Sequence, residues 1–542
     1  MKKKSVLLSI MLIAVSLSAI FAGGKQAQSG SSQTGEKIAG STEGWFAGRD
    51  FKEHMTIEHA DVMIDASKDY TSGDAFVRQW TNTFNIGYKL TPLTFENWAE
   101  RLRVWINSGD APEMFSWDYV HGEAIDYAEQ GMVKKLPNDW KTKYPNLAKT
   151  QTYVPLAELD EKTFGGTYFL FRPLYANNRP AKKLSNHVSL YIRKDWAKAV
   201  GVTLPDAMKI SEVIELARKI KAADPGKVGP NFSPIVCRTG WLNLFVGSNN
   251  QYNGYNANGV FYKGRDGKYH WGAADQSTLD VLKLLNGAYR DGLLDREFYT
   301  IQDPDDLGAF YTVGRSAIAV AESMAWRMTE FDQHMKRDQN LNYDDTVQVV
   351  NLLGEDGYYH DQLRLNYWGV VAFSPKISDK KLDRILQMLD YSCTDEGQLI
   401  LRCGIKGVDW ELDASGNIVS KLEAGASLWE KYAMLPVYVN MLILSDDFQF
   451  SDPNYKKAYR DRTRALFVNR EQQSTNESFP PEVDWNMVLH ASRALNMASM
   501  DYANEYSALI VKPGDIEANW KAWVNEKMPM IQPVIDELNA KK

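Results

Sequence analysis

Short apolar runs alternate with amphipathic runs between residues 56 and 117. Two of these runs fit strands, at 56–61 and 87–94, and two place apolar residues at helical spacing, at 74–84 and 98–106. Strands that alternate with helices through short connections form a mainly parallel sheet with helices packed on it. The pattern therefore predicts an α/β lobe in this part of the chain.

The stretch at residues 105–117 completes this pattern and reads WINSGDAPEMFSW. Gly109 and Asp110 favour a turn after the helix. A short apolar strand then ends in Trp117 and Asp118. In open α/β sheets, ligands bind at the carboxyl ends of the strands, so these two residues are predicted to face a ligand.

Length, composition and charge indicate a globular protein of more than one domain. A chain of 542 residues suggests two or three domains, and its 44% hydrophobic and 24% charged content is that of a globular protein. The formal net charge of -7 becomes about -10 without the three N-terminal lysines. We expect no binding to nucleic acid or to anionic membranes. Cys237, Cys393 and Cys403 fit buried thiols, with one disulfide as the alternative.

Residues 1–22 have the features of a secretory signal peptide. Basic residues precede an apolar run that is too short to span a membrane comfortably, and small residues favour cleavage near Ala22. No cysteine precedes Cys237, so the sequence offers no position for a lipid anchor. We expect a secreted, periplasmic protein with residues 23–44 as a flexible linker.

Several later segments carry more specific patterns. A strand-like run leads into a helix within LYIRKDW at residues 190–196, residues 292–298 read GLLDREF, and residues 391–398 read YSCTDEGQ. Together with SGDAPE at residues 108–113, and in this order, they resemble the extracellular solute-binding proteins of ABC importers, family 1. Within that family the chain is most similar to the LipO-like, oligosaccharide-binding branch.

The resemblance implies a type II periplasmic-binding-protein-like fold with two α/β lobes, three hinge crossings and a helical C-terminal extension. The N-terminal lobe is expected at residues 45–172 plus 320–373, and the C-terminal lobe at 173–319 plus 374–542. The crossings are expected at strands near the lobe boundaries: Phe169–Pro173, Phe310–Ala319 and Trp368–Ser374. The resemblance also implies a monomer that delivers its ligand to the transmembrane subunits of an ABC permease.

The chain contains 16 Trp and 27 Tyr. Sugar rings pack their C–H faces on aromatic planes, and their hydroxyls need partners such as Asp, Glu, Arg and Asn. Most of the aromatic residues should fill cores, but some fall where strands reach the cleft in the family pattern. The predicted ligand-binding residues are Trp117, Asp118, Arg172, Trp241, Glu322, Trp326 and Trp368. A core position is the alternative for the tryptophans, and an ordinary salt bridge is the alternative for Arg172 and Glu322.

Catalytic and metal-binding patterns are missing or incomplete. The sequence has no GxSxG, no P-loop and no dinucleotide fingerprint after a strand. His54 and His59 are five residues apart at a predicted strand, so they point to opposite faces and cannot share a metal ion. Residues 224–229 occupy the position of a calcium loop in some relatives, but Lys227 and Val228 fall among the ligands, which favours a structural loop. We predict no catalytic residue, metal or cofactor.

The sequence therefore favours the substrate-binding component of an ABC importer that captures an oligosaccharide between two lobes. One alternative is a binding protein for a peptide or another polar metabolite. A second is a periplasmic polysaccharide-processing enzyme, because 69 acidic residues allow a pair of catalytic carboxylates that sequence alone cannot locate.

Overall fold

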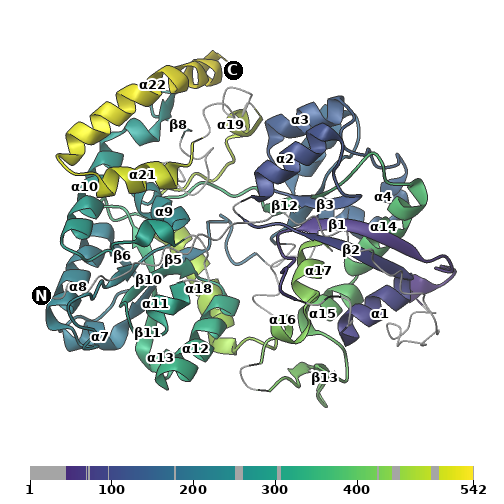
Figure 1. The fold of residues 1–542 in the computed structure, drawn as a ribbon, viewed down its shortest axis with the longest axis horizontal. Coiled ribbons are helices and arrows are strands. Elements are labelled where there is room, and N and C mark those ends of the chain that lie inside the picture. The colour runs from purple at the N-terminus through teal and green to yellow at the C-terminus, as the bar shows by residue number, and fades with distance from the viewer. Residues whose placement is uncertain are drawn as a thin grey trace, which may run out of the picture.

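The computed structural model of the protein describes residues 44–540 except for short gaps, which are 69, 71–73, 96, 176–178, 251–260, 302–306, 424–425, 442–451 and 490–499. The described residues form two α/β lobes that lie side by side (Figure 1). This agrees with the two-lobed α/β fold expected from the sequence. The predicted signal peptide and residues 23–43 of the predicted linker lie outside the described residues.

Five of the described strands form the sheet of the first lobe in the order β2-β1-β3-β12-β4. Its members are β1 (Met55–Asp61), β2 (Ile86–Pro92), β3 (Met114–Trp117), β4 (Leu170–Pro173) and β12 (Tyr367–Phe373). β1 is parallel to β2 and β3, whereas β12 is antiparallel to both β3 and β4. The carboxyl ends of β1 to β4 therefore lie at the same edge as the amino end of β12.

The first helices form as the sequence predicts. α1 (Ala75–Phe84) begins at Asp74, whose carboxylate accepts a hydrogen bond from Val77 N at 2.7 Å. It ends at Asn85, whose left-handed backbone (φ +48°) stops the helix. α2 (Trp98–Ser108) follows β2 and ends in the same way at Gly109. Their apolar faces are buried against the first sheet and its neighbours.

The second lobe contains a sheet in the order β6-β11-β5-β10-β7. Its members are β5 (Val188–Arg193), β6 (Ala207–Lys209), β7 (Ile235–Val236), β10 (Ile318–Glu322) and β11 (Val347–Leu353). β10 is antiparallel to β5 and parallel to β7, so the carboxyl ends of β7 and β10 share an edge with the amino end of β5. The longer helices of this lobe are α8 (Ile210–Ala223), α10 (Gln276–Arg290), α12 (Ala325–Gln339), α18 (Lys457–Gln472), α21 (Tyr502–Val511) and α22 (Ile516–Ala540).

The strand pairings correct the predicted lobe boundaries. β10 and β11 pair with β5, so residues 320–353 belong to the second lobe and not to the first. Conversely, α14 (Asp379–Ser392) and α15 (Asp395–Cys403) bury their apolar faces in one core with β3 and β4 of the first lobe. The crossing expected at Phe310–Ala319 is wrong for the same reason. Residues 308–311 form helix α11, and β10 then returns beside β5, a pairing that a local pattern cannot distinguish from a crossing.

Two connections between the lobes run side by side. β4 leads through residues 174–187 to β5, and β11 leads through residues 354–366 to β12. Asn366 joins them, because its side-chain oxygen accepts a hydrogen bond from Tyr175 N at 3.0 Å and its amide donates to Tyr175 O at 2.8 Å. Asn366 also has a left-handed backbone (φ +60°), which asparagine tolerates better than most residues.

Smaller elements complete the described chain. The helices are η1 (Gly44–Phe46), α3 (His121–Glu129), α4 (Trp140–Lys143), α5 (Pro145–Gln151), α6 (Pro155–Phe164), α7 (Lys194–Ala199), η2 (Thr239–Trp241), α9 (Leu242–Gly247), η4 (Gly272–Ala274), η5 (Phe298–Thr300), α11 (Gly308–Tyr311), α13 (Tyr343–Thr346), α16 (Leu428–Lys431), α17 (Leu435–Met441) and α19 (Trp485–Leu489). Two hairpins pair β8 (Phe261–Lys263) with β9 (Tyr269–Trp271), and β13 (Trp410–Leu412) with β14 (Ile418–Ser420).

Two further features bear on the sequence expectations. Cys237, Cys393 and Cys403 are free thiols, so the disulfide alternative is not realised in this structure. Within the described residues, no helix combines the length and the apolar character needed to cross a membrane.

Candidate functional site

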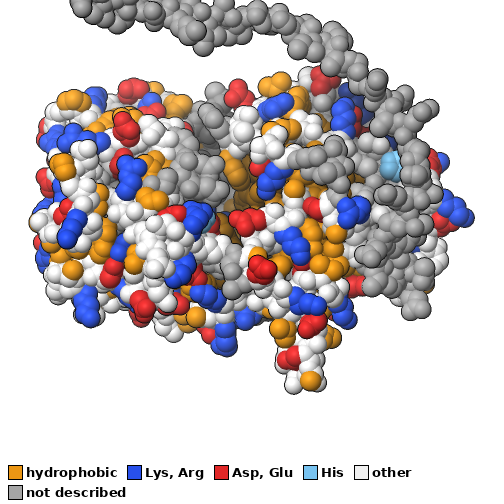
Figure 2. Space-filling model, turned by 60° about the horizontal axis from the view of Figure 1, so that its bottom comes forward, with side chains coloured by type: hydrophobic (Ala, Val, Ile, Leu, Met, Phe, Trp, Pro, Cys, Tyr) orange, Lys and Arg blue, Asp and Glu red, His pale blue; other side chains and the backbone are white. Residues whose placement is uncertain are grey.

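A hollow lies between the two lobes, with hydrophobic side chains in its depth (Figure 2). β3 ends where β12 begins, at one edge of the first sheet, and β7 and β10 end at one edge of the second sheet. Strand ends that face a crevice are the usual place of ligand sites in α/β proteins. Most of the predicted site residues belong to these edges, but their environments differ.

Trp368 lies at the start of β12 and is half-buried. The Arg172 guanidinium lies 4.4 Å from the centre of its ring, and Arg172 Nε donates a hydrogen bond to Trp368 O at 3.2 Å. The rings of Trp98 and Phe95 lie 5.9 and 6.5 Å from that of Trp368, centre to centre. Phe95 is 52% exposed, so the group forms an aromatic shelf at the edge of the first lobe.

A bulge in β12 orients Trp368. The register of β12 against β4 shifts between Tyr367 and Val370. Gly369 within the bulge has φ +67°, and a Cβ atom there would lie 3.2 Å from Trp117 O. The extra residue changes which side chains point to which face of the sheet. Trp368 therefore reaches the edge of the lobe.

Trp326 is the counterpart of Trp368 in the second lobe. It lies in the first turn of α12, is half-buried, and has the Arg327 guanidinium 4.5 Å from its ring centre. Trp326 and Trp368 pack against the same apolar cluster at the hinge, formed by Leu174, Tyr175, Leu184, Met324 and Phe467. The structure thus brings together two of the predicted tryptophans, one from each lobe.

Trp117 is not a ligand-facing residue in this structure. It is 1% exposed, and its ring lies 5.4 Å from Tyr119, 5.4 Å from Tyr127 and 5.6 Å from Phe169. These rings enclose it in the core of the first lobe. The prediction for Trp117 is therefore wrong, because the last residue of β3 points into the core and the next residue points out.

That next residue, Asp118, is exposed to solvent, although the protein around it partly desolvates its carboxylate. Desolvation raises its pKa above the usual aspartate value, and its charge contributes to the raised pKa of Tyr367 at the start of β12. No residue in the described part of the chain donates a hydrogen bond to the Asp118 carboxylate. A carboxylate that is accessible, partly desolvated and without such a donor is available to accept hydrogen bonds from a ligand.

Glu322 forms an ion pair instead. It is 8% exposed, and Arg327 Nε donates a hydrogen bond to its carboxylate at 3.0 Å. Burial raises the pKa of Glu322, while the positive charges of Arg327 and Arg238 oppose that rise. The salt-bridge alternative therefore describes Glu322. Trp241 ends helix η2 near the same sheet edge, but its side chain lies outside the described residues.

Two residues that lie near predicted site residues were not themselves predicted: Phe95 near Trp368, and Arg238 near Glu322. Phe95 follows the carboxyl end of β2, and Arg238 follows that of β7. The rule that selected Trp117 and Asp118, which places ligands at strand ends, would have found both.

The other candidates from the sequence are structural. Asp224 closes its loop, because its carboxylate accepts hydrogen bonds from Val228 N and Gly229 N, each at 2.9 Å. His59 is buried and lies 3.3 Å from the Asp61 carboxylate. No group of three or more metal-ligating side chains occurs in the described ranges.

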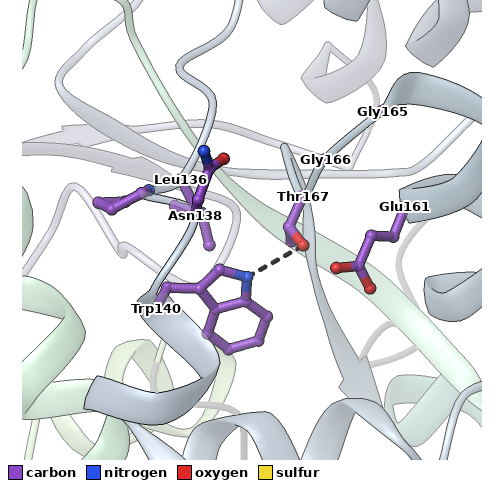
Figure 3. Close-up of a pocket in the computed structure, with 8 residues that line it drawn as sticks. Leu136, Asn138, Trp140, Glu161, Gly165, Gly166 and Thr167 are labelled. Atoms are coloured by element: carbon purple, nitrogen blue, oxygen red, sulfur yellow. Dashed lines mark hydrogen bonds between the residues drawn. The ribbon is translucent and has the colours of Figure 1, made fainter.

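A separate pocket of about 300 Å³ lies in the first lobe between α4 and the end of α6 (Figure 3). Trp140 Nε1 donates a hydrogen bond to Thr167 Oγ1 at 3.0 Å beneath it, and Glu161 forms an ion pair with Lys141 at its rim. The pocket has no residue in common with the predicted site.

Comparison with known proteins identifies the fold. No family model matches the sequence. The chain is 24% identical to lipoprotein LipO of Bacillus subtilis over 346 residues, which are 60% of this chain and 61% of LipO. It thus spans about three fifths of the length of this curated relative.

Solved structures match nearly the whole chain. The alginate-binding protein AlgQ2 superimposes with a TM-score of 0.64 at 14% identity, over 90% of this chain and 98% of AlgQ2. FusA, a substrate-binding protein of a Streptococcus pneumoniae ABC transporter solved with kestose, gives a TM-score of 0.61 at 15% identity and the same coverage. The chain has the solute-binding-protein fold.

Proposed function

We propose that the chain is the substrate-binding component of an ABC importer and captures an oligosaccharide between its lobes. The names of its structural neighbours support this proposal, since one is an alginate-binding protein and another was solved with kestose. An HMO-binding solute-binding protein associated with an ABC transporter of Bifidobacterium longum infantis has a TM-score of 0.58 at 13% identity over 90% of this chain and 98% of its own.

The observation that carries the proposal is the pair Trp326 and Trp368. Each is half-buried, each comes from a different lobe, and both pack on one cluster at the hinge. Sugar rings stack on such aromatic faces. The largely buried Arg172 guanidinium stacks on Trp368, and Asp118, at the neighbouring strand end, supplies an acceptor for hydroxyls.

A ligand that touches both tryptophans stabilises the form in which the lobes are close together. Binding therefore shifts the equilibrium from an open to a closed form, and the permease recognises the closed form. We propose that the mature protein is a periplasmic monomer, released by cleavage near Ala22, and that its partners are the transmembrane subunits of the permease. It binds without catalysing a reaction.

Titration of the mature protein with neutral and uronic-acid oligosaccharides tests this function. Intrinsic tryptophan fluorescence should change with saturation, because Trp326 and Trp368 lie at the proposed site, and the melting temperature should rise through ligand linkage. Emission and melting temperature that stay constant with every sugar contradict the proposal. Short peptides and chromogenic glycosides serve as controls, since saturable binding of peptides or release of chromophore indicates a different function.

A further inference from the structure

One short helix contacts the cores of both lobes. Met487 of α19 is 5% exposed and belongs to the hydrophobic core of the second lobe. Trp485 and Val488 of the same helix are half-buried and pack against the core of the first lobe. α19 lies beside α3 of the first lobe, at the upper side of the gap between the lobes in Figure 1.

Polar contacts fix α19 to the second lobe. The Asp484 carboxylate accepts a hydrogen bond from Tyr269 Oη in β9, with distances of 2.9 and 3.0 Å to its two oxygens. Asn486 Nδ2 donates to the same hydroxyl at 3.0 Å. Asp484 also accepts a hydrogen bond from Met487 N at 3.0 Å, which holds the first turn of the helix. The backbone of α19 is therefore part of the second lobe.

The contact of α19 with the first lobe is apolar, unlike its hydrogen-bonded attachment to the second lobe. Within the described residues, no hydrogen bond or ion pair joins residues 484–489 to the first lobe. Trp485 and Val488 make an apolar contact only, and both keep some exposure to solvent. An apolar contact without directional bonds can separate and form again without leaving a buried polar group unpaired.

We infer that α19 is a latch that the second lobe carries and that holds the lobes together by its apolar contact with the first lobe. When the lobes separate, Asp484, Asn486 and Met487 stay with the second lobe, and Trp485 and Val488 become exposed. The contact exists in the closed form alone, so it shifts the equilibrium toward that form even without ligand. The inference uses the proposed function only where ligand affinity is concerned.

Small-angle X-ray scattering of the ligand-free, full mature protein tests the latch. Trp485→Ala should increase the radius of gyration and the maximum dimension, and Val488→Ala should change them in the same direction by less. Trp429→Ala is the matched control, because Trp429 is a 38% exposed indole on α16 of the first lobe, at the opposite side of the gap from α19 (Figure 1). A folded Trp485→Ala protein whose scattering equals that of the wild type and of the control overturns the inference.

Circular dichroism establishes that each variant is folded, and Val488→Ala decides the question if Trp485→Ala does not fold. Affinity provides a second readout with the sugar that binds best. A smaller closed population should weaken apparent affinity about tenfold in Trp485→Ala. If no sugar binds any variant, the proposed function fails, while the scattering result still decides whether the latch exists.

Discussion

Two tryptophans of neighbouring strands have opposite environments. Trp117 of β3 pairs with Val370 of β12, and Trp368 lies two residues before Val370. Trp117 is enclosed by aromatic rings, whereas Trp368 is half-buried beside Arg172. Both residues lie at strand ends, where ligand-binding residues are expected. Sequence alone does not tell which of them points into the core, because a shift of one residue in strand register moves a side chain to the other face of the sheet.

Substitution separates these two roles. Trp368→Ala should weaken oligosaccharide affinity at least about tenfold, or about 1.4 kcal/mol, because it removes a stacking surface. Trp117→Ala should instead lower the free energy of unfolding by about 3–5 kcal/mol, the usual cost of removing a large buried aromatic side chain. Calorimetric titration and urea unfolding of both variants measure the two effects. A Trp368→Ala protein with unchanged affinity would place the ligand elsewhere.

The pH dependence of binding tests Asp118. Desolvation raises its pKa, so the carboxyl gains its proton at a higher pH than an ordinary aspartate does. If the ionised form accepts hydroxyls, affinity should fall as the pH is lowered from about 7 to about 4. Asp118→Asn should bind more weakly at pH 7 and lose this dependence. Parallel pH profiles for the variant and the wild type would assign the dependence to another group.

At the scale of elements, local signals predicted the first lobe well. α1, α2 and β1 to β3 appear where periodicity, caps and turns place them, since neighbouring residues decide such features. The partner of each strand depends on residues far along the chain. For this reason the predicted boundaries place most of β10 and all of β11 in the first lobe, although they pair with β5 of the second. They also place α14 and α15 in the second lobe, although these helices pack in the core of the first.

In the candidate site, too, local sequence signals predict positions near strand ends but not the side-chain partners. Trp326, Trp368 and Arg172 are predicted from their places near strand ends, and in the structure the two tryptophans pack on the hinge cluster while Arg172 stacks on Trp368. Glu322 had the same sequence signal, but its pairing with Arg327 depends on side-chain geometry that the sequence does not show.

The bulge in β12 yields a prediction about Gly369. A side chain at this position meets both a left-handed backbone and Trp117 O. Gly369→Ala should lower the free energy of unfolding by about 1–3 kcal/mol and should also weaken ligand affinity, because the bulge orients Trp368. Gly407→Ala is the control, since Gly407 has φ +83° and no atom within 4 Å of an added Cβ. Urea unfolding and titration of both variants should show lost affinity for Gly369→Ala alone, and equal affinities would argue against the bulge as a positioning device.

At the scale of the whole molecule, the buried carboxyl of Asp452 lies where the chain passes from the first lobe to the second. Asp452 is 4% exposed and lies just before α18 of the second lobe, after the first-lobe helix α17. Its electrostatic partners are Arg402 of α15 in the first lobe and Arg460 of α18, and its charge helps raise the pKa of Cys403. Asn454 N donates a hydrogen bond to its carboxylate at 2.8 Å.

Asp452 makes the stability of the molecule depend on pH with a definite sign. Burial raises its pKa to about 7, and the two arginines and Asn454 oppose that rise. Between the unfolded value of about 3.9 and this raised value, the folded protein binds more protons than the unfolded chain. The contribution of Asp452 to stability is therefore largest below about pH 4, falls as the pH rises to about 7, and is constant above it. Asp452→Asn replaces the titratable carboxyl with a neutral amide, so the stability of the variant does not depend on this group. The free energy of unfolding of the variant minus that of the wild type should therefore increase between about pH 4 and about pH 7, by up to about 4 kcal/mol. Urea unfolding of both proteins across the range measures this difference. A difference that stays constant would mean that Asp452 keeps an ordinary pKa and that enough water reaches its carboxylate to solvate the charge.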